Sequence, residues 1–465
     1  MRFDHSIFGI FLLLCVLVVF CEESQPPSII LLIGDGMGPN IIKIASHVKY
    51  GDETSSELLN LPYKTLEVGT VAAGDTVTDS AASGTCIASG QRTYIGQLGI
   101  NTAGDRVTTI FDLYQEKGYA VGLVSTKNLD DATPAAFTVH CVSRHDVDCV
   151  SAGLYTSGAD LLLGGGLNAM SPYVSSMIVD KEYMYVNSKS ELEALGEFSP
   201  GDKLFGLFAG GTLSFDVDYT SSSDQPRLLD MTKSALSFFE AQNKPFFLMI
   251  ESGKIDSAGH ANDIYSEVPE MIHFESVVKY VRDWLEEDGK DRLSSHLMLV
   301  TADHECGDLT YSDLSAMDSL PIIDDELADE SNFDDVQAQI KARVKAAESA
   351  ISYNSGGHTA RTVLLGCLGV GSDECPYSTH HMDTFSTMRL VIDGEEGPVD
   401  PSPVPDKSIS NVLLGLYAGA VFGVIGVTII GILSCIGCAR RKKGTRIVEG
   451  VPTTNNLVGN DQEII

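Results

Sequence analysis

Short apolar runs rich in β-branched residues alternate with longer segments of helical periodicity through most of the chain. The strand candidates are residues 29–33, 65–72, 120–125, 246–250, 296–300 and 363–368. Apolar positions at helical spacing mark residues 228–243, 268–287 and 336–351. This alternation predicts one α/β domain over residues 22–393, a three-layer sandwich with a mainly parallel central sheet and helices on both faces.

The two ends of the chain carry apolar segments of different length. Residues 7–20 have the length of the apolar part of a signal peptide, so we expect residues 1–21 to be removed. Residues 412–438 contain no charged residue and are long enough to cross a bilayer. We therefore expect a transmembrane helix over 411–439.

The basic residues after this second segment indicate its orientation. Residues 440–443 read Arg-Arg-Lys-Lys, which favours a cytoplasmic tail over 440–465. A signal for a glycosylphosphatidylinositol anchor would end in its apolar stretch, whereas here a polar segment follows. The Pro-rich residues 394–410 are typical of a stalk. The expected topology is a type I membrane protein with its domain in the lumen or outside the cell.

Charge and cysteine content narrow the function further. The 465 residues carry a net charge of −33, from 64 acidic and 31 basic residues, so binding to nucleic acid is not expected. An anionic phosphate substrate would need strong local cations, and metal ions can supply them. Cys141 with Cys149, and Cys367 with Cys375, are close enough in sequence for local disulfides in an oxidising compartment, although sequence alone leaves other pairings open.

Polar residues follow several strand candidates directly. Asp35 follows the run IILLI, Glu251 follows FFLMI, and Asp303 with His304 follow LMLV. In open α/β sheets, ligands bind beyond the carboxyl ends of the strands. We expect these carboxylates and this imidazole to meet at one edge of the sheet.

Other candidate residues have plainer explanations when each is taken alone. Ser80 in DSAASGT begins a predicted helix, where it could bind a phosphoryl anion or merely cap the helix. Asp256 and His260 are four residues apart, so on a helix they could reach one ion or form a surface pair. Arg144 could hold two phosphate oxygens in a fork or lie free at the surface. His358, flanked by glycines, could be a ligand or a structural residue.

Taken together, these motifs resemble the alkaline phosphatase family. IGDGMG, DSAASGT, DATPA followed by SR, then Glu251 with Asp256 and His260, TADH and GGHT stand in the family's order between Ile29 and His358. The resemblance implies an alkaline-phosphatase-like fold. It also implies hydrolysis of phosphate monoesters to an alcohol and inorganic phosphate.

The resemblance implies two zinc ions and one magnesium ion per subunit. One zinc would be held by Asp256, His260 and His358. The other zinc would be held by Asp35, Asp303 and His304. Magnesium would be held by Asp35, Thr133 and Glu251. These ligand types suit the ions, because zinc accepts mixed nitrogen and oxygen ligands and magnesium prefers oxygen.

The resemblance also assigns roles and an assembly. Ser80 would attack phosphorus to give a phosphoserine intermediate, and Arg144 would hold two phosphate oxygens. Asp131 and Ser257 occupy positions that vary in the family, and both should tune magnesium affinity and pH optimum. Family members are usually homodimers, so a homodimer is expected.

Three alternatives differ in function or location. A phosphodiesterase, sulfatase or phosphomutase of the wider superfamily is one, but Ser80 lacks the Cys/Ser-x-Pro-x-Arg context of a sulfatase. A non-catalytic type I surface receptor is another, although decayed enzymes typically lose ligands and every matched position is kept. The chain ends in DQEII, which faintly resembles a dileucine sorting signal. Both the cell surface and the endolysosomal system therefore remain open.

Overall fold

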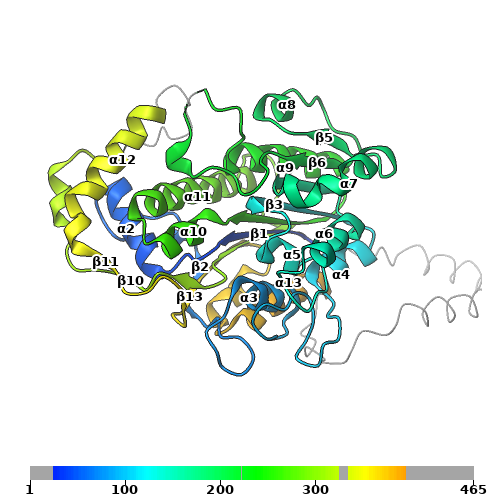
Figure 1. The fold of residues 1–465 in the computed structure, drawn as a ribbon, viewed down its shortest axis with the longest axis horizontal. Helices are drawn as coiled ribbons and strands as arrows, with labels where there is room; N and C mark the ends of the chain where they lie inside the picture. The colour runs from blue at the N-terminus through cyan, green and yellow to red at the C-terminus, as the bar shows by residue number, and fades with distance from the viewer. Residues whose placement is uncertain (1–24, 221, 324–332, 394–465) are drawn as a thin grey trace, which may run out of the picture. The chain divides into compact units, whose positions relative to one another are not determined.

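The computed structural model describes residues 25–220, 222–323 and 333–393. Its centre is a nine-stranded sheet in the order β2-β13-β8-β1-β7-β3-β4-β6-β5 (Figure 1). The strands are β1 Ser28–Gly34, β2 Tyr63–Val68, β3 Ala120–Asn128, β4 Leu161–Gly165, β5 Met184–Val186, β6 Leu204–Leu207, β7 Phe246–Ser252, β8 His296–Thr301 and β13 Val363–Gly369. β13 runs antiparallel to both of its neighbours, and the remaining pairs are parallel. The expected mainly parallel sheet is confirmed.

Helices cover both faces of this sheet (Figure 1). On one face α11 (Ile264–Leu285) packs against both α2 (Pro39–Tyr50) and α9 (Leu228–Gln242). On the other face lie α3 (Ser80–Ser89), α4 (Ile110–Glu116), α5 (Ala132–Ala136) and α13 (His381–Asp393). The other helices are α6 Val147–Thr156, α7 Leu167–Val179, α8 Lys189–Glu193, α10 Lys254–Ala261 and α12 Phe333–Ala347.

The register of the central strands explains where the polar residues gather. Every residue of β1 and β7 is buried, as expected for parallel strands covered on both faces. Ile33 in β1 pairs with Glu251 in β7 and with Thr301 in β8. The three strands therefore end level with one another. The segments that leave their carboxyl ends start from the same edge of the sheet.

Two short antiparallel ribbons complete this edge. β9 (Glu305–Cys306) pairs with β12 (His358–Thr359), and β10 (Leu309–Tyr311) pairs with β11 (Ile351–Tyr353). The β9–β12 pair places His358 opposite Cys306, two residues after His304. A histidine distant in sequence is thereby brought to the end of β8.

The structure confirms most predicted elements and corrects some bounds. The predicted strand 65–72 is in fact β2, which ends at Val68, and the predicted helix 268–287 begins earlier, at Ile264. β4, β5 and β6 were not predicted. Both expected disulfides are present, Cys141–Cys149 and Cys367–Cys375.

The predicted signal peptide 1–21, stalk 394–410, transmembrane helix 411–439 and tail 440–465 lie outside the described residues. Within the described part, none of the helices combines the length and hydrophobicity that crossing a bilayer requires. The membrane anchor and the topology stay predictions.

Candidate metal centre

The first group of candidate ligands is Asp256, His260 and His358. α10 begins directly after β7, and its helical geometry places Asp256 and His260 one turn apart on the same face. The Nε2 atoms of both histidines lie 3.3 Å from Asp256 Oδ1. Cys306, which was not predicted, joins this group, with its sulfur within 4.8 Å of the other ligand atoms.

Backbone carbonyls fix the orientation of these two imidazoles. His260 Nδ1 lies 2.8 Å from the Gly356 oxygen, and His358 Nδ1 lies 3.0 Å from the Thr78 oxygen. Because a carbonyl oxygen only accepts, each neutral ring carries its proton on Nδ1 and a lone pair on Nε2. The two Nε2 atoms are 3.0 Å apart. Two lone pairs facing each other beside a carboxylate oxygen form a donor set that fits a zinc ion.

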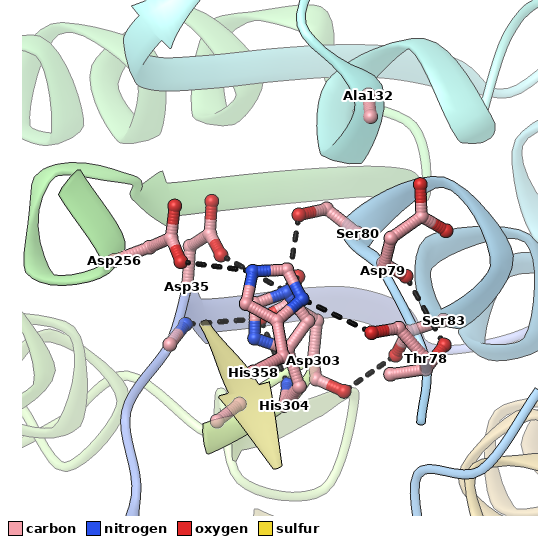
Figure 2. A network of polar contacts seen from close by, with 12 residues as sticks. Asp35, Thr78, Asp79, Ser80, Ser83, Ala132, Asp256, Asp303, His304 and His358 are labelled. Atoms are coloured by element: carbon pink, nitrogen blue, oxygen red, sulfur yellow. Dashed lines mark hydrogen bonds and ion pairs between the residues drawn. The ribbon is translucent and has the colours of Figure 1, made fainter. Parts of the chain in front are cut away.

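The second group, Asp35, Asp303 and His304, lies at the ends of β1 and β8 (Figure 2). His304 Nε2 is 3.2 Å from Asp303 Oδ2 and 3.6 Å from Asp35 Oδ1. Gly36 has a φ of +75°, and a Cβ there would lie 2.7 Å from the Asp256 Cα. Glycine is therefore required for the turn after β1 to pass so close to the first group.

Ser80 is the first residue of α3, and its hydroxyl faces the second group (Figure 2). Ser80 Oγ lies 3.1 Å from His304 Nε2. Asp79 caps the helix by accepting a hydrogen bond from the Ala82 N–H. The remaining free N–H groups and the positive end of the helix dipole lie next to the Ser80 hydroxyl, which favours an anion there.

Two carboxylates hold the guanidinium of Arg144, the residue predicted to bind phosphate. One guanidinium nitrogen lies 3.1 Å from Asp79 Oδ2, and another lies 2.9 Å from Asp131 Oδ1. The Cys141–Cys149 disulfide closes the loop that contains Arg144. These contacts leave the remaining guanidinium N–H groups available to a ligand.

The predicted magnesium ligands Thr133 and Glu251 are both buried. Thr133 lies in α5, and Glu251 is near the end of β7. Ser125 donates a hydrogen bond to Glu251 Oε2. Thr133 Oγ1 and Glu251 Oε1 have no hydrogen-bond partner. Glu251 belongs to neither of the two ligand groups described above.

The carboxylates oppose one another's charge. Burial raises the pKa of Asp35 well above its ordinary value, and the carboxylates of Asp256 and Asp303 raise it further. Burial raises the pKa of Glu251 to about 8. Burial lowers the pKa of His304 well below its ordinary value, with His358 adding to the effect. Such a cluster is stable in its charged form only when cations lie within it.

Lys127, at the end of β3, lies within this cluster of carboxylates and was not predicted from the sequence. Its side chain is buried, and its ammonium lies between Asp35, Asp131 and Asp256, at 3.6, 3.7 and 3.2 Å. Burial opposes its charge, but these three carboxylates outweigh burial and hold the Lys127 pKa above its ordinary value. The only signal in the sequence was a lysine in VSTKN, four residues before Asp131.

A cavity of about 460 Å³ lies away from this centre. Its walls include the residues that begin β1, β7 and β8, among them Ser28, Phe246 and His296. None of the ten predicted site residues lines it. The candidate metal ligands lie instead at the carboxyl ends of the same strands.

The model of the alkaline phosphatase family matches residues 27–362, which is more than half of the chain. The chain belongs to the alkaline phosphatase family. Alkaline phosphatase 4 of Bacillus subtilis is 31% identical over 303 residues, covering 62% of this chain and 63% of that protein. The alkaline phosphatase of Schizosaccharomyces pombe is 31% identical over 313 residues, covering 62% of this chain and 57% of that protein. The chain thus spans less than two thirds of these family members.

Solved structures of the family share the fold. The Thermus thermophilus alkaline phosphatase superposes with a TM-score of 0.65 at 21% identity, covering 80% of this chain and 92% of that one. The cold-active enzyme of Shewanella sp. gives a TM-score of 0.63 at 24% identity, covering 78% and 99%. At these identities the likeness establishes the fold alone.

Proposed function

We propose that this chain hydrolyses phosphate monoesters through a phosphoserine on Ser80. One observation carries the proposal: the Ser80 hydroxyl lies at a helix N-terminus, 3.1 Å from an imidazole nitrogen that two carboxylates also face. The neighbouring group of Asp256, His260 and His358 completes a pair of donor sets suited to two metal ions. A two-metal centre beside a nucleophile is an arrangement suited to in-line phosphoryl transfer.

Ser80, Arg144 and the two metal-ligand groups then have separate roles in the reaction. Ser80 Oγ forms a bond to phosphorus while the bond to the leaving alcohol oxygen breaks. Arg144, oriented by Asp79 and Asp131, holds two non-bridging oxygens in a fork. Two zinc ions, when bound by the two groups, would supply the positive charge that favours the serine alkoxide and the leaving oxygen. Attack by water on the phosphoserine then releases inorganic phosphate and restores the Ser80 hydroxyl.

Magnesium is not part of this proposal. The unpaired oxygens of Thr133 and Glu251 suit a hard cation, but the ammonium of Lys127 already lies on that side of Asp35. A divalent ion bound there would have to lie close to an ammonium ion that is fixed by the fold.

The proposal includes an oxidising location for the domain. Disulfides persist in secreted and lumenal proteins, and two local disulfides lie within the described residues. They support the predicted lumenal or extracellular domain, with the anchor at 411–439. The homodimer, and a location at the cell surface or in the endolysosomal system, stay predictions.

The test is hydrolysis of aryl phosphate monoesters and diesters by the full-length chain, with and without chelator and added zinc. We expect monoester hydrolysis that chelation abolishes and zinc restores. Ser80→Ala should lower kcat by about 10³-fold or more and abolish a phosphoenzyme trapped in acid. Ser89→Ala is the matched control, because that hydroxyl contacts only nearby backbone: it donates to the Thr85 carbonyl and accepts from the Gln91 N–H. Unchanged turnover in Ser80→Ala, or a preference for diesters, would refute the proposal.

A further inference from the structure

One carboxylate in each metal-ligand group faces imidazole with one oxygen and Lys127 with the other. In Asp35, Oδ1 faces His304 at 3.6 Å, whereas Oδ2 faces the Lys127 ammonium at the same distance. In Asp256, Oδ1 faces His260 and His358 at 3.3 Å, whereas Oδ2 faces Lys127 at 3.2 Å. Each carboxylate therefore offers one oxygen to the imidazole side of the site and the other to the same lysine.

Two neighbouring segments hold the Lys127 side chain in this position. A Cβ on Gly253 would lie 2.2 Å from the Lys127 Cγ, so only glycine lets the lysine stem pass the end of β7. The Gly253 N–H donates to Thr126 Oγ1 at 2.9 Å, which ties the end of β7 to the end of β3 beside the lysine. The ammonium is thus placed by packing as well as by charge.

Asp131 extends the arrangement to the phosphate clamp. Its Oδ2 lies 3.7 Å from Lys127 Nζ, and its Oδ1 lies 2.9 Å from the Arg144 guanidinium. A single carboxylate therefore joins the buried lysine to the arginine that would hold the phosphate. Removing the Lys127 charge should therefore affect Asp131 and, through Asp131, the guanidinium of Arg144.

We propose that the Lys127 ammonium is the third cation of this centre, so that the chain operates with two zinc ions and without magnesium. The inference rests on the two-zinc centre of the proposed function. It replaces the expected magnesium on Asp35, Thr133 and Glu251, because a divalent ion on Asp35 Oδ2 would lie against a fixed positive charge. One charge from Lys127, added to two divalent ions, balances the carboxylates of Asp35, Asp131, Glu251, Asp256 and Asp303.

The test is equilibrium dialysis of the full-length chain in zinc-buffered solution against increasing magnesium, with both metals measured by mass spectrometry. The wild-type chain should hold two zinc ions and almost no magnesium at about 1 mM. Lys127→Ala removes the charge and opens space, so this variant should bind about one magnesium ion. The magnesium concentration at half-saturation should be at least about tenfold lower than in the wild type. Magnesium should raise the melting temperature of Lys127→Ala only.

Lys254→Ala is the matched control. Lys254 is also buried, but its ammonium contacts Thr212 and the Phe215 ring and none of the clustered carboxylates. It should bind metals as the wild type does. One tightly held magnesium in the wild type would overturn the inference and leave the proposed hydrolysis intact, as would a Lys127→Ala chain that gains none. Absence of zinc from the wild type would overturn both proposals.

Discussion

At the scale of single residues, groups outside the ligand sets determine what the ligands can bind. The Gly356 and Thr78 carbonyls leave the Nε2 lone pairs of His260 and His358 facing each other. Asp79 and Asp131 similarly orient the guanidinium of Arg144. Orientation of this kind lowers the conformational cost of binding, because the side chains already point at the ligand.

Arg144→Lys tests the clamp. A lysine keeps the charge but loses the fork that Asp79 and Asp131 orient, so kcat/KM for a phosphate monoester should fall by about ten- to a hundredfold. Inorganic phosphate should inhibit more weakly by a similar factor. Arg389→Lys, at an exposed pair with Asp393, is the control and should change neither value. Steady-state kinetics measure both values. If the inhibition constant of phosphate were unchanged in Arg144→Lys, the Arg144 guanidinium would not contact the substrate.

The site residues differ in how far sequence could predict them. Asp35 and Asp303 could be predicted because each follows a buried strand in a recognisable motif. Lys127 could not, because a lone lysine at a strand end does not reveal which way its stem will point. That direction is set by Gly253, which reaches Lys127 only when β3 and β7 pair in the sheet.

At the scale of elements, burial on both faces explains which strands could be predicted. β1, β7 and β8 each contain a continuous apolar run of four or five residues, IILLI, FFLMI and LMLV, which stands out from the surrounding pattern. β4 ends in two glycines, β6 has four residues and β5 has three. Such short pieces carry no periodicity of their own and become strands only by pairing with a neighbour in the completed sheet.

The two disulfides can be compared directly, because each links cysteines eight residues apart and closes a loop of the same length. Replacing either pair by serines should cost about 2.5 kcal/mol of stability, from the loop-closure entropy of the unfolded chain. Only the Cys141–Cys149 loop contains Arg144, so only its loss should also raise KM for phosphate monoesters. Denaturant unfolding and kinetics on both double variants give the comparison. An equal rise in KM for the Cys367/Cys375 variant would show that the effect comes from general destabilisation.

At the scale of the whole molecule, the fold concentrates acidic groups in its interior although the chain already carries a net charge of −33. Asp35, Glu251, Asp256 and Asp303 are buried within one region, and Glu270 is buried elsewhere, near Asp216. Without bound cations, ionising these groups opposes folding. Metal binding and stability are therefore expected to be coupled, with the coupling depending on pH.

Glu251→Gln tests that coupling. Burial raises the pKa of the Glu251 carboxyl from 4.5 to about 8. Between pH 4.5 and pH 8, the folded metal-free chain therefore holds a proton that the unfolded chain releases. Stability of the metal-free protein should therefore fall as pH rises through this window, and Glu251→Gln should make the slope shallower by up to about 1.4 kcal/mol per pH unit. Bound zinc favours the charged carboxylate, so the effect should shrink in the metal-loaded protein.

Glu270→Gln is the control for this comparison. Burial also raises the pKa of Glu270 to about 8, but the carboxylate that adds to this shift is Asp216. The carboxylates that act on Glu251 are Asp131 and Asp303, which lie at the metal centre. Glu270→Gln should change the pH dependence of stability by the same amount with and without zinc. Denaturant unfolding from pH 5 to pH 8, on both variants and in both metal states, separates the two effects. If Glu251→Gln acted equally in both states, Glu251 would not be coupled to the metal centre.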